Sequence, residues 1–121
     1  MGTRVPWDQY EVALLFRAYG NIVDGADINT EAKDLSQQLR KIALHRGTVI
    51  DETYRNVNGM KMQLGNVQYL FTNGAKGLSG ASEMIRNMYQ LYQNNQGEYR
   101  QRLKEAEQLI KSISIEDAFF D

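Results

Sequence analysis

The sequence predicts an all-α fold, and two observations carry that prediction. The 121-residue chain has a single proline, Pro6, so the rest of the chain lacks the residue that most strongly breaks helices. In the long segments, apolar residues recur at the i, i+3, i+4, i+7 spacing that gives a helix one buried face. About five helices are therefore expected, with no sheet. Their ranges are near 8–23, 29–46, 58–72, 80–94 and 97–112.

The first expected helix has a well-marked start. Asp8 is a suitable N-cap, and Glu11 three residues later completes a capping box. Trp7 and Val12 occupy the two positions of a hydrophobic staple, which predicts that Trp7 anchors the core. Stacking of Trp7 on a nucleobase is the alternative. The polar, glycine-containing stretch 20–25 should end this helix.

The second expected helix begins near Asn29 or Thr30 and ends at Gly47. Its core face consists of Ala32, Leu35, Leu39, Ile42 and Ala43. Three cations crowd its C-terminal half: Arg40, Lys41 and Arg46. Cations there are stabilised by the helix dipole, so these residues have a structural reason to be present and also form a candidate binding patch.

A polar turn precedes the third expected helix. Asn56 and Asn58 can hydrogen-bond to their own backbone, and Gly59 accepts positive φ. The apolar stripe of the helix is Met60, Leu64, Val67 and Phe71. A second stripe is polar or small and consists of Lys61, Gly65, Gln68 and Thr72. That second stripe is expected to lie against a partner, with Gly65 allowing close approach.

The last two expected helices follow a glycine-rich connection, residues 72–80. This connection lacks the spacing of a phosphate-binding P-loop, so a plain link with Ser79 or Ser82 as the helix cap is favoured. The two helices should pair as an antiparallel hairpin. We expect one helical domain over 1–121, in which 79–112 covers a three-helix core at 7–74. By analogy, that core is similar to helix-turn-helix and Myb-like domains.

Charge is uneven along a chain whose net charge is −1. Residues 35–82 hold six basic and two acidic groups, whereas the flanking thirds are net acidic. This distribution supports an anionic partner only modestly, because solvated helix faces also carry such charges. There is no cysteine, no signal-peptide run and no stretch long enough to cross a bilayer. We therefore expect a cytoplasmic protein with no membrane partner.

Several short motifs occur together in one order. They are Trp7 with Glu11, Leu14 and Leu15; Leu35, Ser36, Leu39 and Arg40; Arg55 to Gly59; Leu64 and Asn66; and Gly77, Leu78 and Ser82. In this order, residues 7–110 resemble the N-terminal domain of bacterial HNH-type restriction endonucleases. Val57 stands where that family often has proline, and no His-Asn-His nuclease motif is present.

The resemblance implies a DNA-binding or target-recognition module whose nuclease or helicase partner lies in the same or another chain. Its expected partner is double-stranded DNA. The candidate phosphate contacts are Arg40, Lys41, Arg46, Arg55 and Lys76, and the candidate base contacts are Asn58, Lys61, Gln68 and Asn66. For Arg55, bonding to local carbonyls is an equal alternative.

The sequence predicts no enzyme, metal site or cofactor. A nuclease-like motif is formed by Asp27 with Glu31, Ala32 and Lys33. At a helix start, however, the side chains of residues i and i+2 point in different directions, so Glu31 and Lys33 cannot act together. His45, the only histidine, has no convergent partners. The rival hypothesis is a helical protein-interaction or dimerisation module, including a homodimer. It rests on the near-zero net charge, the aromatic residues of the last two helices, and Phe119 and Phe120.

Overall fold

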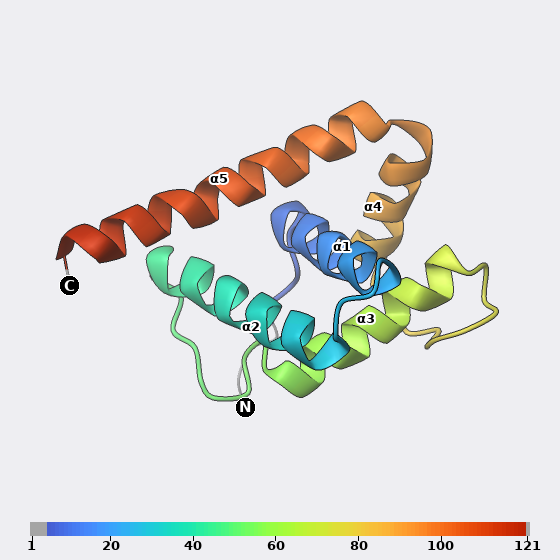
Figure 1. Ribbon diagram of the computed structural model, residues 1–121, viewed down its shortest axis with the longest axis horizontal. Coiled ribbons are helices and arrows are strands. Elements are labelled where there is room, and N and C mark those ends of the chain that lie inside the picture. Colours follow the sequence, from blue (N-terminus) through green and yellow to red (C-terminus); the bar gives the residue numbers. More distant parts are fainter. Residues whose placement is uncertain (1–4, 121) are drawn as a thin grey trace.

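The computed structural model describes the backbone of residues 5–120 and the side chains of residues 5–117. Within these residues there are five helices and no strand, which confirms the predicted all-α class (Figure 1). The helices are α1 (Gln9–Val23), α2 (Ile28–His45), α3 (Val57–Phe71), α4 (Glu83–Asn94) and α5 (Gln96–Phe120).

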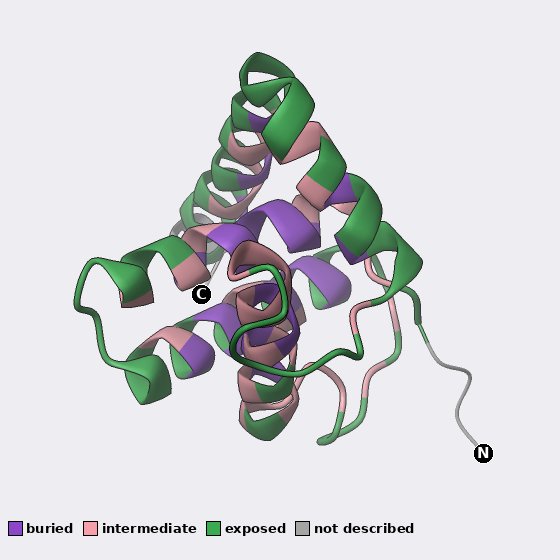
Figure 2. Cartoon of the chain, turned by 90° about the vertical axis from the view of Figure 1, so that its right-hand side faces the viewer, coloured by how far each residue is buried: buried purple, intermediate pink, exposed green. Residues whose placement is uncertain are grey.

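The first helix is the centre of the molecule. It contacts every other helix, and each residue from Glu11 to Phe16 is buried. A surface helix buries one stripe, so this unbroken run indicates that α1 is covered on several sides. Figure 2 shows the buried segments converging where the helices cross. The predicted core face of α2 is buried as expected, with Leu39 fully inaccessible, and Leu14 and Leu15 of α1 are fully inaccessible as well.

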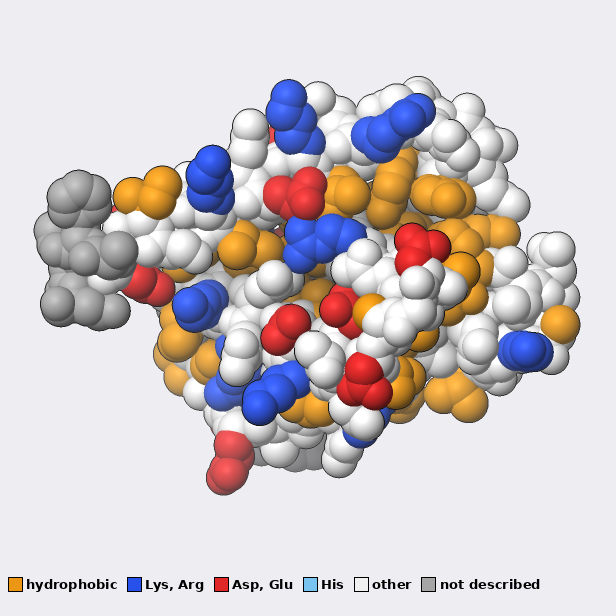
Figure 3. All heavy atoms as spheres, in the orientation of Figure 1, with side chains coloured by type: hydrophobic (Ala, Val, Ile, Leu, Met, Phe, Trp, Pro, Cys, Tyr) orange, Lys and Arg blue, Asp and Glu red, His pale blue; other side chains and the backbone are white. Residues whose placement is uncertain are grey.

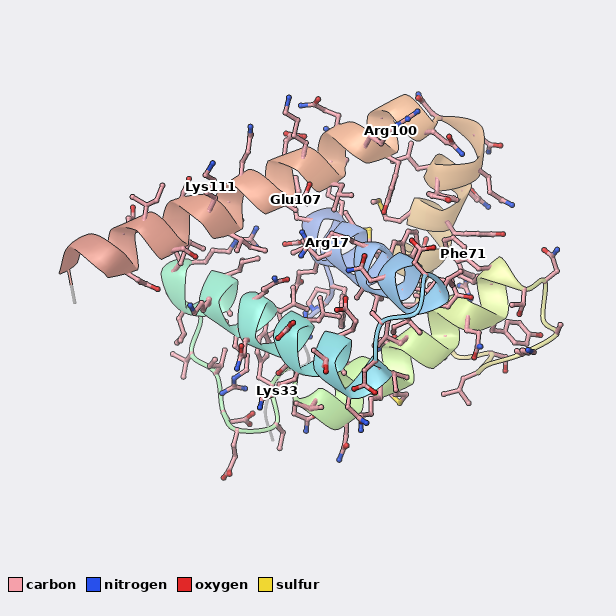
Figure 4. The ribbon with its side chains drawn as sticks, viewed as in Figure 1. Arg17, Lys33, Phe71, Arg100, Glu107 and Lys111 are labelled. Atoms are coloured by element: carbon pink, nitrogen blue, oxygen red, sulfur yellow. The ribbon has the colours of Figure 1, made fainter. Side chains whose placement is uncertain are left out.

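An aromatic cluster joins α1 to α3, α4 and α5. Phe71 lies 5.3 Å from Phe16, 4.9 Å from Tyr89 and 5.1 Å from Tyr92, measured between ring centroids. Figure 4 labels Phe71 at the end of α3 that faces α4. Tyr99 of α5 completes the cluster, 5.1 Å from Tyr92. These edge and tilted contacts fix the C-terminal helices to the first three.

Side-chain caps set the starts of four helices. Asp8 and Glu11 form the predicted capping box of α1. Asp27 caps α2, which begins at Ile28, slightly before the predicted Asn29 or Thr30. Ser82 caps α4, so that helix begins at Glu83 and the prediction of residue 80 was too early.

The turn before α3 differs from its prediction in one respect. Asn56 is the N-cap, and its side chain accepts a hydrogen bond of 2.7 Å from the Gly59 N–H. Gly59 is therefore an ordinary helical residue. The left-handed residue is Arg55, with φ of 46°. The long-range contacts of its side chain, given below, hold this conformation.

The last helix is longer than predicted, and its pairing with α4 is more open. The prediction ended it at residue 112, but α5 continues to Phe120. Ile113 is buried, and Glu116 and Asp117 lie 3.4 and 4.0 Å from His45 and Lys41 of α2. The helices α4 and α5 meet at Asn95 and diverge, so they form a V rather than a close antiparallel hairpin (Figures 1 and 2). The side chains of Phe119 and Phe120 lie outside the described residues.

A candidate recognition groove between α3 and α4

An open groove of about 1130 Å³ lies beside the N-terminal halves of α3 and α4. Five separate segments line it: residues 5–7, the turn 53–56, the N-terminal half of α3, the loop 78–80 and the N-terminal half of α4. We call it the α3/α4 groove and define it by six lining residues. They are Trp7, Arg55, Gln63, Asn66, Leu78 and Met84.

A nearly buried ion pair forms one wall of the α3/α4 groove. Arg55 Nε lies 2.9 Å from Glu11 Oε2, and the two side chains are 9% and 5% exposed. Arg55 Nη2 also donates to Glu11 Oε1 and to the backbone carbonyls of Val5 and Pro6. The guanidinium lies between the rings of Trp7 and Tyr54, at 4.7 and 4.6 Å from their centroids. The charge of Arg55 is thus neutralised, and its Nε and Nη2 groups donate to acceptors within the chain.

Helix α2 clamps the turn that carries Arg55. Ser36 Oγ donates to the Arg55 carbonyl oxygen at 2.6 Å, and Arg40 Nη1 donates to the carbonyl oxygens of Asp51 and Tyr54. Within the turn, hydrogen bonds from Thr53 lower the pKa of Asp51. Because α2 fixes the backbone on one side and Glu11 fixes the side chain on the other, the positive φ of Arg55 is held from both directions.

The loop after α3 forms the opposite wall by folding back onto that helix. The Leu78 N–H donates to the Gly65 carbonyl oxygen at 2.9 Å, and a Cβ added to Gly65 would lie 3.0 Å from the Leu78 side chain. A Cβ on Gly77 would lie 2.3 Å from the Gly65 oxygen. The expectation that the second stripe of α3 lies against a partner is wrong at Gly65, because the chain's own loop covers that residue.

A pair of amides is fixed inside the groove. Asn66 is 3% exposed, and its Oδ1 accepts a hydrogen bond of 3.1 Å from the Gly80 N–H. Its Nδ2 donates to Gln63 Oε1 at 3.0 Å. A backbone N–H requires an oxygen acceptor, so Gly80 determines the orientation of the Asn66 amide and, through it, that of Gln63. The Gln63 Nε2 group is left as a donor on the groove side.

Apolar side chains border the groove. Met62 and Leu78 are half exposed, and Val5 and Met84 are exposed to a lesser extent. All four line the groove, on different segments. The groove therefore combines apolar walls with a few fixed polar groups, which is the composition of ligand sites in proteins.

The predicted contact residues fall into three groups. The first group consists of Arg40, Arg46 and Arg55, each of which binds a carbonyl or carboxylate of the chain itself. Arg46 lies 2.6 Å from Asp8, and the hydrogen bond between them raises the pKa of Arg46. Asn58 and Lys61 lie on the first turns of α3, next to groove residues.

The third group lies away from the first turns of α3. Gln68 lies on α3 about 17 Å from the start of that helix, at 1.5 Å per residue, and Lys76 lies in the loop that follows α3. Lys41 lies beside Asp117 of α5. Among the described residues, the ammonium groups of Lys61 and Lys76 form no ion pair and no hydrogen bond.

The remaining surface is mixed in charge. On the face drawn in Figure 3, Lys and Arg side chains alternate with Asp and Glu. Figure 4 shows one such pair, Arg17 of α1 directed at Glu107 of α5, with 2.9 Å between Nη1 and Oε2. This face therefore carries no extended basic patch of the kind that drives nonspecific DNA binding.

The remaining candidates for chemistry are dispersed. Asp27 is a helix cap, Glu31 accepts a hydrogen bond from Asn21, and Lys33 is exposed. The described residues contain no group of three or more His, Asp or Glu side chains able to hold a metal ion. None of the described helices is both long and apolar enough to span a bilayer.

Most of the groove lining was not identified from the sequence as contacts, including Gln63, Met84 and Asn87. Gln63 and Asn66 are three residues apart on one helix, so helical spacing indicates that they are neighbours. Met84 precedes Ile85 in an apolar run, so the sequence predicts a core residue at this position. No local pattern distinguishes it from a buried residue.

The comparisons with known proteins leave the chain without an assigned relative. No protein-family model, curated protein or solved structure matches it.

Proposed function

We propose that this chain is a non-catalytic recognition module of a bacterial restriction or related defence system, which binds double-stranded DNA on the surface around the α3/α4 groove. One observation carries the proposal. Residues that support the family resemblance, although far apart in the sequence, line this groove or hold its walls. They are Trp7, Glu11, Arg55, Asn56, Asn66, Leu78 and Ser82.

The local electrostatics are compatible with a polyanion near this groove. The N-terminal ends of α3 and α4 both border it, through Asn56 and Ser82. The positive ends of helix dipoles favour nearby phosphates. Lys61 is half-buried on the same turns of α3 and has no anionic partner among the described residues. In this proposal Lys61 contacts a phosphate and Asn58 lies close to the DNA.

The proposal gives the predicted arginines an indirect role. Arg40 and Arg55 hold the turn 51–56 and thereby position Asn58 and Lys61, while Arg46 pairs with Asp8 at the start of α1. Few cations remain for phosphate contact, so affinity for duplex DNA should be moderate and sensitive to salt. Cleavage of DNA would require a nuclease or helicase domain, in the same chain or another.

Fluorescence anisotropy with a labelled duplex tests this proposal. The chain should bind the duplex at about 50 mM salt and bind it more weakly at about 200 mM, because counterions are released on binding. Absence of binding at the lower salt concentration would overturn the proposal.

A helical protein-interaction or dimerisation module is the second candidate. The observation in its favour is the exposure of Met62 (51%) and Leu78 (50%) beside the groove, since clustered exposed apolar side chains mark protein interfaces. Light scattering over a range of protein concentrations tests the dimer form of this candidate. A mass that doubles with concentration, together with no DNA binding, would replace the first proposal with this one.

A further inference from the structure

The α3/α4 groove has no free charge on the wall formed by Arg55. That guanidinium is paired with Glu11, enclosed by two aromatic rings and bonded to two backbone carbonyls. A phosphate would have to compete with the Glu11 carboxylate for it. On another wall, Glu83 of α4 adds a negative charge that disfavours a phosphate. The interior of the groove is therefore better suited to a group without negative charge, while phosphates remain outside with Lys61.

The groove also contains a donor that is oriented in advance. Asn66 is buried and fixed by Gly80, and it holds the oxygen of Gln63. The Nε2 group of Gln63 is thus presented without the rotational freedom of a surface glutamine. Asn87 of α4 lines the same groove and carries a second amide. Amide groups hydrogen-bond to the edges of nucleobases.

Apolar surfaces flank these amides on several sides. Trp7 lies on one segment, Met62 on α3, Leu78 on the loop and Met84 on α4. A partner helix would need a continuous apolar groove to match its i, i+3, i+4, i+7 face. Here amide and hydroxyl groups interrupt the apolar surface. A ligand with apolar faces and a polar edge matches this arrangement better, and a nucleobase is such a ligand.

We propose that the α3/α4 groove accepts one nucleobase extruded from the duplex, with its faces against Trp7 and the methionines and its edge on Gln63. This inference rests on the proposed DNA binding and specifies the group that is read. Extrusion has to overcome pairing and stacking, and a mismatched base is extruded more easily than a paired one. Binding should therefore favour a duplex that contains a mismatch.

The test uses the full chain and two duplexes that carry 2-aminopurine at the same position, one paired with thymine and one mismatched. We expect binding to raise 2-aminopurine fluorescence, because the base leaves the stack. The mismatched duplex should bind about tenfold more tightly. Trp7 is the only tryptophan of the chain and lines the groove, so its emission should change on binding.

Two variants separate base recognition from folding. Gln63→Met keeps an unbranched side chain of similar length but removes the amide, and it should abolish the preference for the mismatch while leaving affinity for the paired duplex within about twofold. Gln108→Ala, at an exposed position of α5, should leave both duplex affinities unchanged. Thermal melting of each variant checks that it is folded. A folded Gln63→Met variant that retains the preference would exclude Gln63 as the base-reading residue and overturn the inference as stated.

The outcomes distinguish the two proposals. Tight binding of both duplexes, with equal affinity and unchanged 2-aminopurine fluorescence, would overturn base extrusion and leave DNA binding intact. No binding to either duplex at about 50 mM salt would overturn both proposals. Binding of a polypeptide in the groove would then be the remaining use of its apolar walls.

Discussion

Arg55 and Glu11, 44 residues apart, form a two-pronged ion pair: Arg55 Nε lies 2.9 Å from Glu11 Oε2, and Nη2 lies 3.2 Å from Oε1. The same Glu11 carboxylate accepts a hydrogen bond from the Asp8 N–H in the capping box of α1. One side chain therefore connects the start of α1 to the turn before α3. The groove wall depends on this connection.

Removal of the arginine should destabilise the fold strongly. Arg55→Ala leaves Glu11 buried without its partner, and breaking a buried pair costs about 3–5 kcal/mol. We expect chemical denaturation to show a free energy of unfolding that is lower by an amount in this range. Arg46→Ala is the matched control, because the Arg46 and Asp8 side chains are both more than a third exposed and such pairs contribute about 1 kcal/mol or less. Equal losses for the two variants would contradict the structural role of Arg55.

Loss of the capping box should lower stability by less, and without changing DNA binding. Asp8→Ala should lower the free energy of unfolding by about 0.5–2 kcal/mol, because the Glu11 N–H loses its acceptor. DNA affinity measured under folding conditions should change little. An unchanged melting temperature would show that Asp8 does not stabilise the start of α1.

The loop that covers α3 should not tolerate a side chain at Gly77. Gly77 has φ of +94°, and an added Cβ would lie 2.3 Å from the Gly65 oxygen. Gly25 is the matched control, with φ of +113° and no atom within 4 Å of an added Cβ. Gly25→Ala should cost about 1–2 kcal/mol from backbone conformation alone. Gly77→Ala should cost clearly more and should weaken any ligand binding in the groove. Melting curves and binding curves for the two variants check both expectations.

Tyr99 should make the fold sensitive to alkali. Burial raises the pKa of Tyr99 above its ordinary value near 10. Above about pH 10 the unfolded chain loses this proton more readily than the folded chain, so stability falls as pH rises through this region. Tyr99→Phe should show a shallower fall in melting temperature between about pH 9 and 11. The measurement at pH 7 is the baseline, because the variant also loses the hydrogen bond from the Tyr99 hydroxyl to the Ala13 carbonyl oxygen. The same slope for both proteins would contradict the account.

The sequence was informative where local spacing determines structure. The capping box at Asp8 and Glu11 and the apolar stripe of α2 are short-range patterns, and the structure confirms them. The position of Arg55 could not be predicted in this way, because its partner Glu11 lies 44 residues away. From sequence alone, Arg40, Arg46 and Arg55 resemble a free basic patch. Tertiary contacts supply the carboxylates and carbonyls that occupy them.

The end of α5 and the loop that covers α3 also depend on contacts between distant residues, which local sequence patterns do not predict. Nothing in the residues after Ser112 predicts a continuing helix, and Ile113 is buried only because α5 extends along the rest of the molecule. The stripe containing Gly65 is small and polar, which fits a partner surface as well as it fits the chain's own loop. Only the fold reveals that Leu78 occupies it.

The salt dependence of DNA binding by a Lys61→Ala variant tests the central claim most directly. If Lys61 contacts a phosphate, the slope of log affinity against log salt should flatten by about 0.9 for duplex DNA. Lys111→Ala is the matched control, since Lys111 lies exposed on α5, on a different helix from α3 (Figure 4). It should leave the slope unchanged. A folded Lys61→Ala variant with the affinity and slope of the parent chain would contradict the claim that the start of α3 contacts DNA.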